Sequence, residues 1–263
     1  MKRIFVSLAL AVTLSGCGIS QQQEVAMGQD YAQQINAQLP IVRDPELNRY
    51  MNVLGDQIAS RTSRADLDWR FFIVDSREVN AFAVPGGFIY VNRGLIERTT
   101  KMDELAGVLG HEIGHVVQRH SIQQMEKAQG ANIGVTLACV LTNVCNSQAA
   151  GALINVAGGA VFARFSRQDE LEADQEAVAN TVRAGINPQG IVTMFQKLIA
   201  ERKSRPSAVE GWFATHPLEE DRIDRAQAVI AAIPASQRNS LTSNSSNYNS
   251  FVARLRSLPA PRQ

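Results

Sequence analysis

The chain has 263 residues, of which 45% are hydrophobic and 19% are charged; this composition can bury a core and excludes a disordered or collagen-like protein. Its 26 basic and 25 acidic residues nearly cancel and form no long basic block, so a general nucleic-acid binder is not expected. Three cysteines are too few for a disulfide scaffold, and only four histidines occur.

The N-terminus has the pattern of a secretion signal. Residues 1–16 join two basic residues to an apolar run that is shorter than the roughly 20 residues of a membrane span. Residues 14–17 resemble a bacterial lipobox, which implies cleavage before Cys17 and lipidation of that residue. We therefore expect a signal peptide over residues 1–16, a tether over residues 17–23, and an anchor in the outer membrane, which Gly18 favours.

Helical patterns follow the tether and then give way to strand patterns. A helix is expected over residues 24–38, and Asp44-Pro45 begins a second helix with an apolar stripe. Three short strand-like runs come next, at residues 69–74, 81–84 and 88–91. Pro85-Gly86-Gly87 is expected to form the turn between the last two runs.

Helix-start signals dominate the rest of the chain. Thr100 with Asp103 resembles a capping box and opens a helix that runs to about residue 120. Three further starts are expected, at Ser166 with Asp169, at Asn187-Pro188 and at His216-Pro217. Gly185 is expected to end the first of these three helices.

These elements predict the domain organisation. Residues 24–233 form one domain of the α+β class, mostly helical with a small β-sheet, and residues 234–263 form a loose tail rich in serine and asparagine. Residues 133–163 are small and apolar but carry interrupting amides, so we expect two closely packed helices or a mobile hairpin there. Cys139 and Cys145 in this segment either pair or remain buried thiols.

Residues 111–115 read H-E-x-x-H within a helical pattern. His111 and His115 are four residues apart, so their imidazoles share a helix face and can bind one metal ion. Glu112 lies beside them, where its carboxylate can take a proton from a metal-bound water. The motif indicates a hydrolase with one Zn²⁺ per chain and Glu112 as general base.

A catalytic zinc site needs a third protein ligand and an open position. His120 follows His115 by five residues, which turns it off the ligand face, so we expect it at the surface or at a helix end. Glu170 and Asp174 share a face of a downstream helix, where Glu170 could bind zinc and Asp174 could accept a hydrogen bond from a ligand histidine. An acidic pair at this spacing is also common on a solvated helix face.

The run Ser166-Arg167-x-x-Glu170-x-Glu172-Ala173-Asp174, after an H-E-x-x-H motif, resembles peptidase family M48, which includes HtpX-like and BepA-like proteases. Residues 80–95 resemble the strand segment of that family, and residues 215–223 resemble its His-Pro motif. The similarity runs from about residue 24 to residue 232, and it implies a gluzincin-like metalloprotease domain. The zinc ligands that it implies are His111, His115 and Glu170, with Glu112 as general base.

The resemblance leaves the role of His216 open. It allows an oxyanion stabiliser or a reversible fourth zinc ligand that silences the enzyme, and a helix-capping histidine is the third interpretation. Arg222, one to two turns further on, is expected near the oxyanion. Residues 81–84 are expected either to offer a strand edge to an extended substrate or to be a core hairpin only.

Our leading hypothesis is a zinc metalloendopeptidase that is lipid-anchored in the bacterial cell envelope and faces the periplasm. Its expected substrates are unfolded or misassembled envelope proteins, which places it in protein quality control. The alternative is a non-catalytic chaperone or assembly lipoprotein for outer-membrane proteins with a structural zinc. A peptidase of cell-wall crosslinks ranks below both, because no sugar-binding module is recognisable in the sequence.

Overall fold

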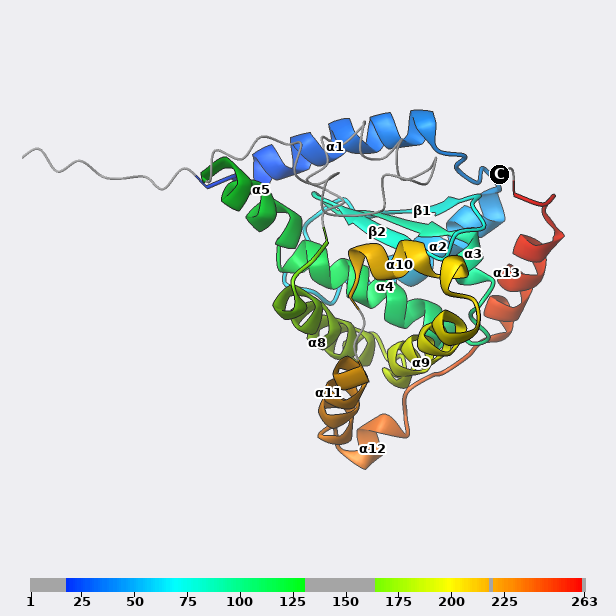
Figure 1. The fold of residues 1–263 in the computed structure, drawn as a ribbon. Helices are drawn as coiled ribbons and strands as arrows, with labels where there is room; N and C mark the ends of the chain where they lie inside the picture. Colours follow the sequence, from blue (N-terminus) through cyan, green and yellow to red (C-terminus); the bar gives the residue numbers. More distant parts are fainter. Residues whose placement is uncertain (1–17, 131–163, 218–219, 262–263) are drawn as a thin grey trace, which may run out of the picture.

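The computed structural model describes residues 18–130, 164–217 and 220–261 (Figure 1). The expected signal peptide, Cys17, Cys139 and Cys145 lie outside these residues. Within them, the fold is a small sheet surrounded by helices, as the sequence predicts. None of the helices in the described part of the chain is both long enough and apolar enough to cross a bilayer.

The first two helices carry the caps and the apolar stripes that their sequences indicate. Ser20 and Gln23 form a capping box at the start of α1 (Gln21–Gln38), so this helix begins inside the segment expected to be a tether. Asp44 caps α2 (Pro45–Ala59) by accepting hydrogen bonds from two backbone amides. The apolar stripe of α2 is buried and consists of Leu47, Met51, Leu54 and Ile58.

All three expected strands are present and form one sheet in the order β1-β3-β2. They are β1 (Arg70–Val74), β2 (Ala81–Val84) and β3 (Phe88–Asn92). β1 is parallel to β3, and β2 is antiparallel to it. The tight β2–β3 turn uses positive φ angles of 83° at Gly86 and 101° at Gly87, a conformation that only glycine adopts without strain.

The two faces of the sheet are covered by different helices (Figure 1). α1 lies across one face, where the rings of Phe72 and Phe82 stack on either side of Tyr90 at centroid distances of 4.8 and 4.9 Å. α2 and α4 (Met102–Val117) lie against the other face and form the larger core. Residues 102–116 of α4 are all buried, so α4 is the central helix of the domain.

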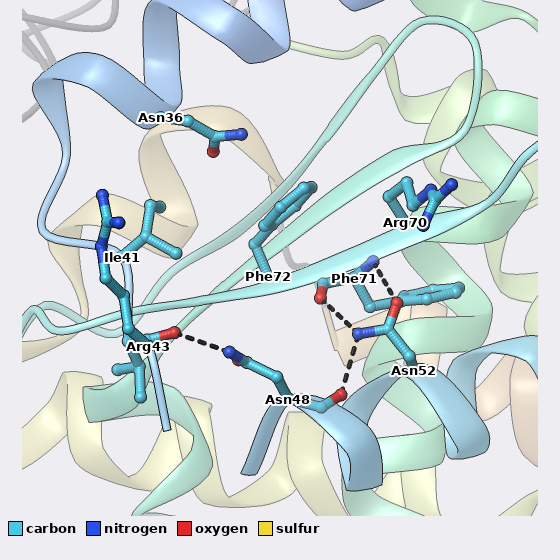
Figure 2. Close-up of a pocket in the computed structure, with 9 residues that line it drawn as sticks. Asn36, Ile41, Arg43, Asn48, Asn52, Arg70, Phe71 and Phe72 are labelled. Carbon is cyan, nitrogen blue, oxygen red and sulfur yellow. Dashed lines mark hydrogen bonds between the residues drawn. The ribbon is translucent and has the colours of Figure 1, made fainter. Parts of the chain in front are cut away.

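The outer edge of β1 is closed by a side chain (Figure 2). The Asn52 amide donates to the Phe71 carbonyl at 3.0 Å, and the Phe71 amide donates to Asn52 Oδ1 at 3.2 Å, as a neighbouring strand would do. This pairing blocks edge-to-edge association at that point. A cavity of about 510 Å³ lies beside this edge, and its lining includes Asn36, Arg43 and Phe72 but none of the candidate site residues.

Small residues let the next helix approach α4 closely. A Cβ at Gly114 would lie 2.9 Å from the carbonyl oxygen of Ala173 in α8 (Arg167–Arg183), so only glycine fits there. The capping box of Ser166 with Asp169 opens α8, and Gly185 with a φ of 76° follows its end, both as predicted. α9 (Gln189–Ser204) packs on the same side of α4.

Further expected helix boundaries differ in the structure. Lys101, not Thr100, precedes α4, and Glu104 accepts the hydrogen bond from the Thr100 amide at 2.6 Å. α4 ends at Val117 because Arg119 adopts a φ of 58°, and α5 (His120–Gly130) starts directly after it. His216 does not open a helix; its amide closes the end of α10 (Glu210–Thr215), and α11 (Glu220–Ala231) begins later.

The segment expected to be a loose tail contains ordered helices. α12 (Ala235–Arg238) leads to α13 (Ser246–Ser257), whose apolar face is buried in the main core. The Phe251 ring stacks on Tyr50 of α2 with a centroid distance of 4.5 Å. The remaining short elements are α3 (Arg93–Ile96) and the 3₁₀ turn η2 (Pro206–Ala208). The packed domain therefore extends beyond residue 233.

Phe251→Ala tests whether α13 is part of the cooperative core. Because Phe251 is 4% exposed, its truncation is expected to lower the free energy of unfolding by about 3–5 kcal/mol. The measurement is urea unfolding followed by circular dichroism. Ser250→Ala on the exposed face of the same helix is the control, and an equal stability of both variants would contradict the packing of α13.

Candidate metal centre

The H-E-x-x-H motif lies at the C-terminal end of α4. One turn of helix separates His111 from His115, and both imidazoles project toward the same point. Their side chains and that of Glu112 are fully shielded from solvent. The motif is therefore built into the core and is not displayed on a surface.

Two other elements complete the cluster. Glu170 comes from the first turn of α8, and His216 comes from the residue that closes α10. One ligand atom of each lies within 4.8 Å of the others and of the two motif imidazoles, so all four donors meet at one place. The structure thus brings together the three expected ligands and His216.

The distances between these donor atoms fit one small metal ion. His111 Nε2 lies 3.1 Å from His115 Nε2 and 3.3 Å from His216 Nδ1. Glu170 Oε1 lies 3.0 Å from His216 Nδ1 and 3.4 Å from His115 Nε2. Tetrahedral ligands at zinc distances of about 2.0–2.1 Å are separated by about 3.3 Å. Three imidazoles and one carboxylate are also a donor set that zinc accepts.

Glu112 is a buried carboxylate with an unsatisfied hydrogen-bonding capacity. Among the described residues, neither of its oxygens has a hydrogen-bond partner, although Oε1 lies 3.5 Å from His216 Nε2. Burial raises the pKa of Glu112. A carboxylate with a raised pKa beside a cluster of metal ligands is suited to accept a proton and to release it later.

Asp174 and Arg222 hold the cluster from outside. Asp174 Oδ1 lies 2.9 Å from His111 Nδ1, which is the contact expected for an acceptor that orients a ligand histidine. Arg222 donates two hydrogen bonds of 2.8 Å to Asp174, and its Nη1 lies 2.5 Å from Glu170 Oε2. The guanidinium, expected near an oxyanion, is thus paired with the two carboxylates of α8.

The buried charges shift the protonation of the cluster. Burial alone would lower the pKa of His111, but its hydrogen bonds to Asp174 and Glu170 raise it to about 9. Burial lowers the pKa of His115 well below its usual value, and a charge on His111 lowers it further. For Glu170, burial opposes ionisation, but the charges of His216 and Arg222 outweigh it and hold the pKa well below its usual value. Glu170 is thus ionised, as a metal ligand must be.

Of the two places expected for His120, the helix end is correct and the surface is wrong. The His120 side chain is buried at the start of α5, with Nδ1 at 2.9 Å from Nδ1 of His115. A spacing of five residues turns a side chain off the shared face only within one continuous helix, and the left-handed backbone of Arg119 breaks that helix just before His120. Phe165, which the sequence reasoning also missed, stacks on His115 at a centroid distance of 3.9 Å.

Comparison with known proteins is consistent with this geometry. The model of Peptidase family M48 matches residues 44–230. The "Beta-barrel assembly-enhancing protease" of Yersinia pestis is 33% identical over 82% of this chain and 45% of its own length, and that of Escherichia coli (strain K12) is 32% identical with the same coverage. The "Metalloprotease LoiP" of Escherichia coli (strain K12) is 24% identical over 88% of this chain and 98% of its own length. The chain thus spans about half the length of the first two relatives.

Glu170→Gln tests the contribution of α8 to metal binding. Removing the charge of this buried ligand is expected to reduce the bound metal from one Zn²⁺ per chain to well below one after dialysis. Atomic emission on the purified protein measures the metal content. Glu176→Gln, one to two turns further along α8 and outside the cluster, is the control and should retain the ion. Full zinc occupancy in Glu170→Gln would rule out Glu170 as a ligand.

Proposed function

Because the chain belongs to peptidase family M48, we propose that it is a zinc-dependent metalloendopeptidase that hydrolyses peptide bonds in envelope proteins. The observation that carries this proposal is the buried set of four metal-ligand atoms beside the carboxylate of Glu112, which accepts no hydrogen bond from the described residues. A ligand cluster alone would also suit a structural ion, but a structural site has no need for a buried carboxylate that neither binds the ion nor accepts a hydrogen bond from the described residues. Glu112 is what turns the cluster into a candidate catalytic site.

His111, His115 and Glu170 would hold the ion. Zinc, when bound there, would supply the Lewis-acid chemistry that makes water nucleophilic near neutral pH and polarises the scissile carbonyl. Glu112 would take the proton from the attacking water and deliver it to the departing amine. Burial of Glu112 raises its pKa and thereby makes both transfers feasible in one catalytic cycle.

For His216 we favour the reversible fourth ligand among the three roles considered. Its Nδ1 lies 3.3 Å from His111 Nε2 and 3.0 Å from Glu170 Oε1, which are the separations expected between ligands of one tetrahedral ion. An oxyanion stabiliser would not require these distances. The capping contact at the end of α10 is made by the backbone amide to Trp212 and does not use the imidazole. Since catalysis needs an open coordination position, the described arrangement corresponds to a resting, silenced enzyme.

The substrate would bind as an extended segment beside β2. β2 is the last strand in the order β1-β3-β2, and it packs against α4, which carries the ligand histidines. An edge strand can add a peptide through main-chain hydrogen bonds, which suits a protease that accepts many sequences. Unfolded proteins offer such segments along much of the chain, whereas folded proteins keep most of them paired.

The place of action follows from the relatives and from the N-terminal pattern. Two relatives are named as beta-barrel assembly-enhancing proteases, which supports an envelope role for this chain. We propose that the chain is lipid-anchored through Cys17 in the outer membrane, faces the periplasm and removes unfolded or misassembled envelope proteins. The rival function, a chaperone or assembly lipoprotein with a structural zinc, would suit the closed set of four ligands, and loss of Glu112 separates the two.

Glu112→Gln is the decisive variant for the enzyme hypothesis. Cleavage of casein or of an unfolded outer-membrane barrel is expected to fall by at least about 100-fold, because the amide cannot accept the proton from water. Zinc content, measured in the same samples, should remain at the wild-type level since Glu112 is not a ligand. Equal cleavage by both proteins with zinc bound would exclude the mechanism and favour the chaperone.

His216→Ala separates the three roles of this residue. If the imidazole silences the enzyme, its removal should raise the rate of casein cleavage and weaken zinc binding. A fall in rate at unchanged zinc affinity would instead indicate stabilisation of the oxyanion. An unchanged rate and an unchanged affinity would leave only the capping role. Steady-state kinetics and a competition assay with a coloured zinc chelator provide both quantities.

A further inference from the structure

The ring nitrogen of His115 that faces away from the other three ligands, Nδ1, has a contact of its own. It lies 2.9 Å from Nδ1 of His120, and Nε2 of His120 lies 3.2 Å from Oε2 of Glu172. The three residues come from α4, α5 and α8, so the contacts join three helices. His115 and His120 are buried, and the Glu172 side chain is 35% exposed, so the chain of contacts runs from the cluster to the protein surface.

Counting donors and acceptors fixes the direction of these contacts, and the count rests on the proposed metal site. When His115 gives the lone pair of Nε2 to the metal, its Nδ1 must carry the proton. Nδ1 of His120 then has to accept, because two N–H groups cannot face each other at 2.9 Å. The remaining proton of His120 sits on Nε2 and points to the carboxylate of Glu172.

We infer that His120 and Glu172 are positioning residues that form a carboxylate–imidazole relay onto the metal ligand His115. His111 has the direct version of the same arrangement, because Asp174 contacts its Nδ1 without an intermediate. Such outer partners fix the tautomer and the orientation of a ligand imidazole and increase its basicity toward the metal. Among the described residues, no carboxylate contacts Nδ1 of His115 directly, and the relay connects this nitrogen to Glu172 instead.

Further contacts hold both ends of the relay. Gln168 Nε2 donates to the other oxygen of Glu172 at 2.7 Å, which orients the carboxylate. Asp169, the only other acid of the described residues paired with His120 Nε2, is more distant at 4.0 Å. Phe165 stacks on the ring of His115 and also contacts that of His120, which excludes water from the pair.

A buried ionic cluster fixes the turn that delivers His120. Arg119, whose φ is 58°, donates from Nε to Glu24 Oε2 at 2.8 Å. Glu24 also accepts two hydrogen bonds from Arg64, and Arg64 donates a third to the carbonyl of Val116 at the end of α4. A non-glycine residue in a left-handed conformation persists only where its surroundings enforce it. The conformational free energy that the left-handed Arg119 costs is consistent with a precise placement of the His120 imidazole.

The first test is the affinity of the full chain for Zn²⁺, measured by competition with a coloured chelator and without any substrate. His120→Ala should weaken binding by about 10–100-fold, as loss of an outer partner generally does. His120→Asn keeps an acceptor oxygen at the position of Nδ1 and should recover part of that loss. Glu172→Gln should weaken binding less than His120→Ala, and because the Glu172 side chain is partly exposed, this variant is expected to fold.

The second test reads the proton positions. Imidazole ¹⁵N shifts of the zinc-loaded chain should show the proton on Nδ1 of His115 and on Nε2 of His120. The control is Glu176→Gln, which removes the same charge from the same helix but contacts Gln118 and Asn180 and not His120. It should keep the affinity and the ¹⁵N pattern of the wild type.

The outcomes distinguish this inference from the proposed function. Wild-type zinc affinity in a folded His120→Ala, or a proton on Nδ1 of His120, overturns the relay even if the protein is an active peptidase. Weaker binding in His120→Ala with the expected proton pattern supports the relay even if no peptide is cleaved. A chain that binds no Zn²⁺ overturns both proposals together.

Discussion

The interaction on which the rest of the structure depends is the compensation of buried charge at the end of α4. Glu112, Glu170 and Asp174 are removed from water, and Arg222 is the buried guanidinium that faces them. When the histidines are neutral, as metal ligands are, and all three carboxylates are ionised, these four groups carry a net charge of −2, which a low-dielectric interior does not tolerate. A divalent cation is the natural counterion. The convergence of α4, α8, α10 and α11 on one point is therefore an electrostatic requirement as well as a packing arrangement.

Close packing makes that convergence possible. The Glu170 carboxylate can reach the imidazoles of α4 only if the axes of α4 and α8 lie near each other, and Gly114 against Ala173 provides the space. Gly110 similarly faces Ala177 one turn away, and a Cβ at Gly110 would lie 3.1 Å from the Cα of Ala177. A methyl group at either glycine would push α8 outward and carry Glu170 and Asp174 with it. The small residues of this interface thus set the distance between the carboxylates of α8 and the imidazoles of α4, and with it the strength of their electrostatic interaction.

The sequence predicted those features that depend on spacing within one element. The three strands, the capped starts of α2 and α8, and the shared helix face of His111 and His115 are all of this kind. The burial of His120 was not predicted, because a single left-handed residue, Arg119, changes the direction of the chain, and no rule for an uninterrupted helix detects it. The tail beyond residue 233 was misjudged from its serine and asparagine content, although the buried residues of α13 have helical spacing: Tyr248, Phe251, Val252 and Leu255. The contacts of Arg222 could not be foreseen, since they depend on how α11 meets α8.

The early start of α1 has a geometric consequence for the proposed anchor. Since Ser20 already caps the helix, three residues, 18–20, separate Cys17 from the folded body. They can span at most about 10 Å when fully extended. The amide of Ile19 is in addition bonded to Glu126 of α5, which shortens the free length further. A domain joined to its anchor by so short a linker would lie against the bilayer surface. Its substrates would be limited to polypeptides that arrive at, or emerge from, that surface.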